Sequence, residues 1–511
     1  MLAWTIYLSF AGALAARLAP SKQAARILAL VTALAGLGLG LTALAHWQPG
    51  TMLTVAQVAW IPQLGISYHL AADGISLTLV LLTGIAATAG ILFSWNIEHR
   101  TQEFFAFYLV LIGGVYGVFL SFDLFLLFVF YEIAIIPKYF LIAIWGSVPR
   151  DAAAGQGGSQ REYAAMKLAL YSFAGSALVL AGMVAAWTVS GGTSLSFEVL
   201  ARYPFPAHFQ MWAFPMVFVG FAVLAGMWPF HTWAPTGHAA APTAASMLLA
   251  GVVMKLGAYG CLRVAMMLFP AGLGPWGFHV LGLGSWRDVF ALLAVIGIVY
   301  GATVALVQRD FKFVIGYSSV SHMGFVLLGL MTLTTFGLDG AVLQMFSHGV
   351  IAGLLFAVVG RMVYDRTHTR QLRELAPMRL AHAIPFAAVT FILAGMASIG
   401  LPGFSGFVAE FQVLVGTWQA LPWLVVVAGI GILVGIAFTW RALNLAFFGE
   451  PAAHAHEGHR LPPITLPEKL GSLLLLASTL VVGLYPRVLT DLILPSLNSP
   501  LFEGLRKGVW R

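Results

Sequence analysis

The chain has 511 residues, of which 60% are hydrophobic and only 9% are charged, and its formal net charge is +7 at pH 7. Soluble domains carry about 25% charged residues, so this composition excludes a soluble globular protein and indicates an all-α polytopic membrane protein. The single cysteine, Cys261, excludes an internal disulfide and an iron–sulfur cluster, which is usually held by four thiolates.

Fourteen apolar segments are long enough to cross a bilayer, which takes about 20 apolar residues. They are continuously apolar and do not alternate, so a β-barrel is not expected. The first segment has neither a basic region before it nor a cleavage site after it, which predicts a retained helix rather than a signal peptide. The expected spans are 2–19, 27–46, 75–95, 105–122, 124–145, 164–189, 210–233, 240–268, 288–307, 312–334, 338–364, 381–417 with a break, 422–448 and 466–486.

The distribution of Lys and Arg predicts an orientation. With the N-terminus outside, the inner loops contain 17 of the 26 Lys and Arg residues, and the outer loop 47–74 contains none. Positive residues concentrate in cytoplasmic loops, so we expect a multi-pass protein of a bacterial-type inner membrane. Because the same rule explains the net charge, no nucleic-acid partner is expected. Lys312 lies at a span end and is expected to snorkel to the inner interface.

Two of the spans are interrupted by helix-breaking residues. Span 7 contains Pro229 and Pro235, and span 12 contains Pro402 and Gly403. Proline removes a backbone hydrogen bond, and paired broken helices in two halves of a membrane protein indicate a transport site near the midplane. The breaks lie five spans apart, which predicts two inverted five-helix repeats, spans 4–8 and 9–13. The expected divisions are 1–100 (helices 1–3), 101–270 (first repeat), 284–448 (second repeat) and 449–511 (inner loop, last helix and tail).

Three ionisable residues, Glu132, Lys255 and Glu410, lie inside apolar spans. A charge at bilayer depth costs about 2.5–3.5 kcal/mol on insertion scales, so such groups face a protein interior or a water path. One such carboxylate alone is as easily a structural group that is hydrogen-bonded between helices. Burial moves the pKa of a carboxyl up and of a lysine down, toward the range where protons are exchanged. The three together predict a proton or ion route.

Several long motifs resemble one known family. The runs are WIPQLGISYHLAADGISLTLVLLTG, GVFLSFDLFLLFVFYEIAIIPKYFLIAIWG, SSVSHMGFVLLGL and LPGFSGFVAEFQVL. They resemble the antiporter-like subunits of respiratory complex I, the proton-pumping NADH:quinone oxidoreductase, and chain M (subunit 4) in particular. The resemblance runs from about residue 60 to the last helix. The same fold occurs in subunits of multisubunit Na⁺/H⁺ antiporters and membrane-bound hydrogenases.

The resemblance implies roles for individual positions. Glu132 matches a span 5 glutamate that gates proton uptake, Lys255 matches a lysine at the membrane centre, and Glu410 matches the ionisable group of span 12 that passes the proton outward. Four histidines also match family positions, two on the hydrated central axis and two near the break in span 7: His322 and His348, and His231 and His238.

The chain departs from the family pattern in span 7. The family has a lysine seven residues before the first histidine, where this chain has Leu224, and an aspartate before the second histidine, where it has Gly237. Glu132 therefore lacks its usual partner. Two replacements are open: Lys138, six residues further along the same span and about 600° around the helix, or His231.

The leading functional hypothesis is a non-redox, proton-translocating subunit of complex I. Such a subunit would bind no cofactor or metal itself, with NADH, FMN, iron–sulfur clusters and quinone bound by partner subunits. Its partners would be neighbouring antiporter-like membrane chains and the lipid bilayer. Two alternatives stay open: a Na⁺/H⁺ antiporter subunit without a redox partner, and a degenerate, non-pumping subunit of a related membrane complex.

Overall fold

The computed structural model describes residues 1–147, 156–280, 283–450 and 461–508. Within them, twelve helices are long and apolar enough to cross a membrane. The membrane helices are α2 (Lys22–His46), α3 (Gly74–Phe93), α4 (Thr101–Leu120), α5 with α6 (Leu124–Ile133, Ile135–Trp145), α7 (Gln156–Val189), α9 (Ala207–Ala225), α11 through η3 (Thr243–Met266), α13 (Trp286–Val307), α14 (Phe311–Thr332), α15 with η5 (Thr335–Ala357, Val358–Tyr364), α21 (Pro422–Phe447) and α22 (Leu466–Leu484).

The two remaining expected spans are present as shorter helices. Segment 2–19 forms α1 (Ala3–Arg17). Segment 381–417 forms α19 (Pro385–Ser398) and α20 (Ser405–Ala420), which are separated by a break. The predicted fold of about fourteen membrane helices with two interrupted spans is therefore confirmed.

The first break separates α9 from α10 (Trp233–Ala240). α9 ends at Gly226, whose φ of 81° suits a glycine helix cap. Pro229 lies in the break, whereas Pro235 lies in the first turn of α10, where its missing N–H is not needed. The Val223 carbonyl at this helix end accepts from the Gly226 N–H at 3.2 Å and from the indole of Trp233 at 2.8 Å, so α10 is tied to the end of α9 across the break.

The second break, between α19 and α20, has the same construction. Pro402 lies in it, and Gly400 and Gly403 have φ angles of 72° and 101°. The non-helical chain passes close to a charged side chain, because a Cβ on Gly400 would lie 3.2 Å from Oε2 of Glu410. Both breaks therefore lie beside the buried polar residues described below.

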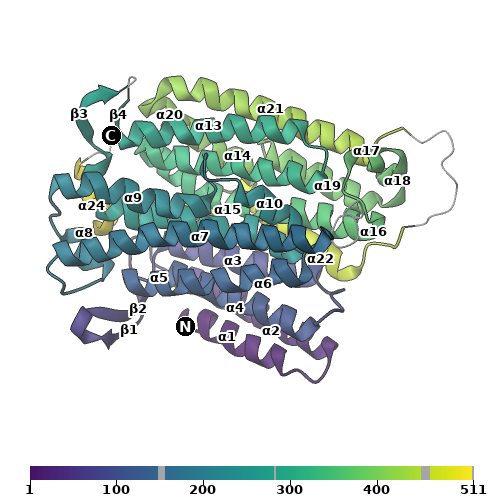
Figure 1. The fold of residues 1–511 in the computed structure, drawn as a ribbon, viewed down its shortest axis with the longest axis horizontal. Helices are drawn as coiled ribbons and strands as arrows, with labels where there is room; N and C mark the ends of the chain where they lie inside the picture. The colour runs from purple at the N-terminus through teal and green to yellow at the C-terminus, as the bar shows by residue number, and fades with distance from the viewer. Residues whose placement is uncertain (148–155, 281–282, 451–460, 509–511) are drawn as a thin grey trace.

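The helices form an elongated bundle with two distinct ends (Figure 1). One end, the hairpin end, carries two antiparallel hairpins and the short helices of the C-terminal segment. The opposite end, the loop end, carries short helices that connect the spans. The hairpin end comprises β1–β2 (Leu53–Ile61, Ile66–Ala72), β3–β4 (Pro275–Val280, Leu283–Ser285), α8 (Phe197–Arg202), α23 (Arg487–Leu497) and α24 (Glu503–Gly508), and the loop end comprises α16 (Asp365–Thr367), α17 (Leu372–Leu375) and α18 (Leu380–Ala383).

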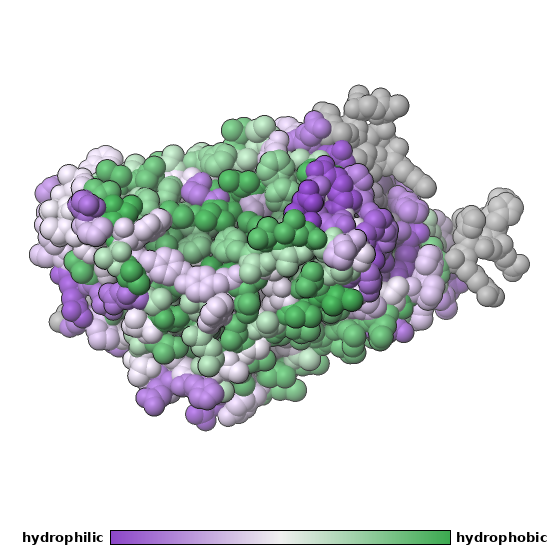
Figure 2. Space-filling model, turned by 90° about the horizontal axis from the view of Figure 1, so that it is seen from below, coloured by the Kyte–Doolittle hydropathy of each residue, from purple (hydrophilic) through white to green (hydrophobic). Residues whose placement is uncertain are grey.

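Hydrophobic side chains cover the middle of the surface, while hydrophilic ones gather toward the two ends, most densely at the loop end (Figure 2). Large apolar residues along α21 are exposed, including Trp423, Val426, Leu433 and Trp440. An apolar belt between two polar ends is the pattern expected of a protein whose middle lies in lipid.

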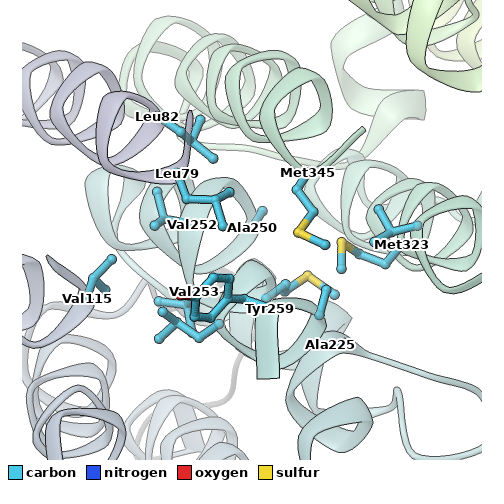
Figure 3. Packing of buried hydrophobic residues seen from close by; sticks show 14 of the residues in the cluster. Leu79, Leu82, Val115, Ala225, Ala250, Val252, Val253, Tyr259, Met323 and Met345 are labelled. Atoms are coloured by element: carbon cyan, nitrogen blue, oxygen red, sulfur yellow. The ribbon is translucent and has the colours of Figure 1, made fainter. Parts of the chain in front are cut away.

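The centre of the bundle is the eighth span, in which residues 244–269 are all buried. Figure 3 shows Val252, Val253 and Tyr259 from this span among side chains of α3, α4, α14 and α15. The span is not a regular α-helix: η2 (Leu249–Val253) and η3 (Cys261–Met266) are π-helical, with α12 (Met254–Gly260) between them. π-helical turns are rare and often occur at functional sites.

Candidate functional site

Lys255, on α12, lies at the centre of the site. Its side chain is fully buried, and Nζ donates to the carbonyl of Ala250 in the π-helical turn. Nζ also lies 2.8 Å from Nδ1 of His348 on α15. Because lysine only donates, Nδ1 of His348 accepts this hydrogen bond, which assigns the ring hydrogen to Nε2 in a neutral imidazole.

From His348 the contacts continue to Glu410. The rings of His348 and His322 are stacked, with centroids 5.5 Å apart and an interplanar angle of 30°. Nδ1 of His322 lies 2.9 Å from Oε1 of Glu410, and its Nε2 lies 3.1 Å from the Ser398 hydroxyl. Gln344 donates to the same Oε1 at 3.2 Å. We call Lys255, His348, His322 and Glu410 the central chain.

A small cavity follows the central chain. It offers about 10 Å³ to the centre of a water-sized sphere, which is about the space that one water needs. The polar residues that line it come from four helices, α14, α15, α19 and α20: Ser318, Ser319, His322, Gln344, Ser347, His348, Ser398 and Glu410. Water bound among such groups can connect proton donors and acceptors that do not touch.

His238, on α10, extends this group toward the first half of the molecule. It is fully buried between the rings of Trp233 and Phe356, at centroid distances of 6.0 and 5.3 Å. It interacts electrostatically with both Lys255 and His348. The half-helix after the first break therefore places an imidazole beside the central chain.

His231, the histidine at the first break, makes no hydrogen bond or ring contact with the central chain in the described part of the structure. Its ring packs against Tyr300 of α13 and Tyr317 of α14, with centroids 5.0 and 6.3 Å away. Within the described part of the chain, its ring makes no hydrogen bond to Glu132. The geometry gives no support to His231 as the partner of Glu132.

Glu132 and Lys138 lie on either side of a kink. α5 ends at Ile133 and α6 begins at Ile135, and Pro137 in the first turn of α6 lacks the N–H that a continuous helix would need. The two side chains interact electrostatically, and Ser176 of α7 approaches the Glu132 carboxylate. Nζ of the buried Lys138 has no hydrogen-bond partner among the described residues. The pair is close in space but is not joined.

Leu224 occupies the expected lysine position as a buried apolar residue at the end of α9. Here α9 packs against the helix that carries Lys255, because a Cβ on Gly257 would lie 2.4 Å from the Ala225 nitrogen and 3.0 Å from the Leu224 carbonyl carbon. The contact between α9 and α12 is therefore made by close backbone packing rather than by charge.

Comparison with known proteins agrees with this architecture. The model of the NADH:quinone oxidoreductase/Mrp antiporter transmembrane family matches residues 121–436. The chain belongs to this family. NADH-quinone oxidoreductase subunit M of Rhodobacter capsulatus is 38% identical over 460 residues, which cover 88% of this chain and 84% of the relative. The subunit M of Escherichia coli K12 is 36% identical over 437 residues, which cover 84% of this chain and 82% of the relative.

Solved structures show the same fold. A chain of respiratory complex I from Thermus thermophilus superposes with a TM-score of 0.85 at 26% identity and covers 99% of this chain, with 100% of that chain matched. A chain of the Mrp complex from Dietzia sp. gives a TM-score of 0.84 at 19% identity, over 100% of this chain and 99% of that chain. The resemblance to the complex I and Mrp family is therefore confirmed.

One expectation for this family member is wrong. Lys312, expected to snorkel, is only 1% exposed; its Nζ donates to the Ala241 carbonyl at 2.9 Å and lies 5.7 Å from the centre of the Tyr364 ring. The Ala241 carbonyl, just after the end of α10, is within reach, so the ammonium binds it instead of reaching for the interface.

Sequence reasoning also missed several polar residues of the site. Gln344 and Ser398 bind members of the central chain, but neither residue type stands out in a membrane helix, where such residues commonly join helices. Arg263, which the sequence did not single out, is fully buried in an ion pair with Asp73. Asp73 and Arg263 lie 190 positions apart in the sequence, so only the fold brings them together. In the described part of the chain, no cluster of His, Cys, Asp or Glu is suited to a metal ion.

Proposed function

We propose that this chain is the proton-translocating, antiporter-like membrane subunit of an NADH:quinone oxidoreductase. The observation that carries the proposal is the central chain, which links a fully buried lysine to a buried glutamate through two histidines. Relatives named subunit M of this enzyme support the choice of complex. The subunit itself would carry no electrons: NADH, FMN, iron–sulfur clusters and quinone would be bound by partner subunits, and its own neighbours would be other antiporter-like membrane chains.

We place the hairpin end outside and the loop end inside a bacterial-type cytoplasmic membrane, with the N-terminus outside. The support is the charge asymmetry: the loops assigned to the inside hold 17 of the 26 Lys and Arg, as the positive-inside rule requires. In this orientation α15 runs inward, and α20 runs from the centre of the membrane outward.

In this mechanism Lys255 stores the proton. Its Nζ donates to Nδ1 of His348, so a proton passed along this bond leaves an imidazolium that can release the hydrogen on Nε2. Water in the adjoining cavity carries the proton to His322. The ring of His322 then protonates Glu410, with which it already pairs.

Charge at other sites would control this movement. A positive charge on His238 or His348 repels one on Lys255, so loading one group favours release from another. Glu132 and Lys138 would act upstream, where a change in their separation alters the field along the route. These roles rest on position in the fold and on the family resemblance.

The test is purification from the native membrane in mild detergent, followed by reconstitution into proteoliposomes in sodium-free buffer. Co-purification of flavin and iron–sulfur chains, with NADH-driven acidification of the lumen, is the expected result. Small antiporter chains without redox cofactors, or ion movement that requires Na⁺, would instead indicate the antiporter function. A complex that oxidises NADH normally while Glu410→Gln and Lys255→Met both pump like the parent would identify a degenerate subunit.

A further inference from the structure

Asp339 is a buried carboxylate that none of the steps above uses. It lies in the second turn of α15 with 2% of its surface exposed. Its Oδ1 is buried and has no hydrogen-bond partner among the described residues. A buried carboxylate oxygen without a donor is costly, and the cost at this depth in an apolar span calls for a compensating role.

Asp339 belongs to a ladder of polar pairs between α15 and α20. Ser347 pairs with Ser405 at 2.8 Å, and Gln344 donates to Glu410 at 3.2 Å. The next pair along the two helices is Asp339 with Gln412. From one pair to the next, the residue number falls along α15 and rises along α20, as in antiparallel helices. Each pair therefore lies closer to the hairpin end than the one before.

The helices remain in close contact at this level. A Cβ on Gly340 would lie 2.8 Å from the Val413 nitrogen and 2.9 Å from the Cβ of Gln412. Further out, a Cβ on Gly416 would lie 2.5 Å from the Gly337 nitrogen. This tight glycine contact closes the seam between α15 and α20 beyond Asp339, so a route to the surface must leave the seam at that residue.

The side chains between Glu410 and Asp339 are arranged to accept hydrogens. Oε1 of Gln344, Oε1 of Gln412 and Oδ1 of Asp339 are all buried without a donor in the described part of the structure. A water bound in the seam and a proton on the Asp339 carboxylate can each donate a hydrogen to such acceptors. A proton transfer from Glu410 to Asp339 requires both of them.

The surface lies next to Asp339. α23 packs against α15 at the hairpin end, and Asp339 interacts electrostatically with Asp491 of α23. The Asp491 side chain is 54% exposed and pairs with Arg487 at 3.3 Å. The groups facing Asp339 are thus Gln412 from α20 and Asp491 from α23, and the Asp491 side chain is exposed at the surface.

We propose that Asp339 is the release group through which this subunit passes protons from Glu410 to the outer surface beside α23. The proton leaves the Glu410 carboxyl for a water in the seam, and that water gives a proton to Oδ1 of Asp339, so no charge or atom is gained or lost. Asp339 then releases the proton toward the surface at Asp491. This inference rests on the proposed function, because it assigns the outlet of that same route.

The test uses the intact complex in proteoliposomes, with the rate of lumen acidification measured per NADH oxidised. Asp339→Asn keeps the shape and the Gln412 contact but cannot carry the proton, and it should lower pumping at least about tenfold, because a positioned proton-transfer group contributes roughly 10²–10⁴-fold to a rate. Asp339→Glu should keep most of the pumping. The matched control is Thr417→Val on the same seam, whose hydroxyl bonds only to Val413 of its own helix at 2.7 Å; it should pump like the parent.

The outcomes separate this inference from the proposed function. Parent-like pumping by Asp339→Asn, while Lys255→Met fails to pump, would overturn the release role and leave the proposed function standing. Parent-like pumping by Lys255→Met would overturn both. Equal losses in the Asn and Glu variants would show a structural role and also overturn the inference. If Asp339→Asn does not assemble, Gln412→Leu replaces it: reduced pumping supports the seam route, and unchanged pumping overturns it.

Discussion

The two halves of the molecule hold their buried charges in different ways. In the second half, His348, His322 and Glu410 are linked to Lys255 by direct contacts and ring stacking beside a water-sized cavity. In the first half, Glu132 and Lys138 interact electrostatically across a kink, without a hydrogen bond between them. The difference teaches that the buried groups around Lys255 are joined by contacts, as the proposed conduit requires, whereas Glu132 and Lys138 would act on it through their electric field or through movement.

The cause of the difference is visible at the end of α9. Leu224 is apolar, so no cation from the broken helix reaches toward Glu132, and the α9–α12 contact is made by backbone packing at Gly257. A cation at Leu224 would place a charge at this contact. In the proposed mechanism, Lys255 of α12 and His238 of α10 are therefore the groups that act on His348.

The largest effect is expected from Lys255. Lys255→Met keeps the length and apolar stem of the side chain but removes the group that we propose stores the proton, and NADH-driven pumping should fall at least about tenfold. Lys22→Met at the loop end, which breaks only an exposed pair with Glu98, is the control and should pump normally. Normal pumping by Lys255→Met would erase the distinction between the halves.

A smaller but still clear effect should separate two histidines. His348→Ala interrupts the central chain and should slow pumping roughly fivefold to tenfold. His231→Ala, which removes a ring packed against Tyr300 and Tyr317, should change pumping by less than about twofold. Both rates are measured per NADH oxidised in assembled complex. Equal losses would show that His231 carries protons as His348 does, against the geometry.

The smallest effect is expected from the unjoined pair. Lys138→Met removes a positive charge near Glu132 without breaking a hydrogen bond, so turnover should fall by about twofold while the number of protons per NADH stays constant. Turnover and pumping are measured together. Unchanged turnover, pumping and assembly would remove Lys138 from the mechanism, and a loss as large as that of Lys255→Met would mean that both halves conduct.

Much of this fold follows from sequence, because each signal depends on local chemistry. Spans need length and hydropathy, and the breaks at Pro229 and Pro402 need only the missing proline N–H. Glu132, Lys255 and Glu410 were recognisable because charge in an apolar segment is rare. The joining of Lys255, His348, His322 and Glu410 was expected from the family resemblance, and the structure brings these four together.

What could not be predicted depends on long-range contacts. The π-helical turns around Lys255 have no residue signature, and hairpin β1–β2 lies in a segment identified only as a loop without basic residues. The sequence predicted Lys312 at the interface, because its carbonyl partner, Ala241, is 71 residues away and nothing near Lys312 in the chain indicates it. The role of Asp339 depends on Gln412, which only the packing of α20 on α15 brings near.

The most direct test of the central claim is a double-mutant comparison of Lys255→Met and Glu410→Gln, alone and together, with protons pumped per NADH as the measurement. If the two residues belong to one route, the double variant should pump as many protons per NADH as the single variant that pumps less, because the second change interrupts a path that is already blocked. If the two losses multiply, the residues act on separate routes and the central chain is not the conduit described here.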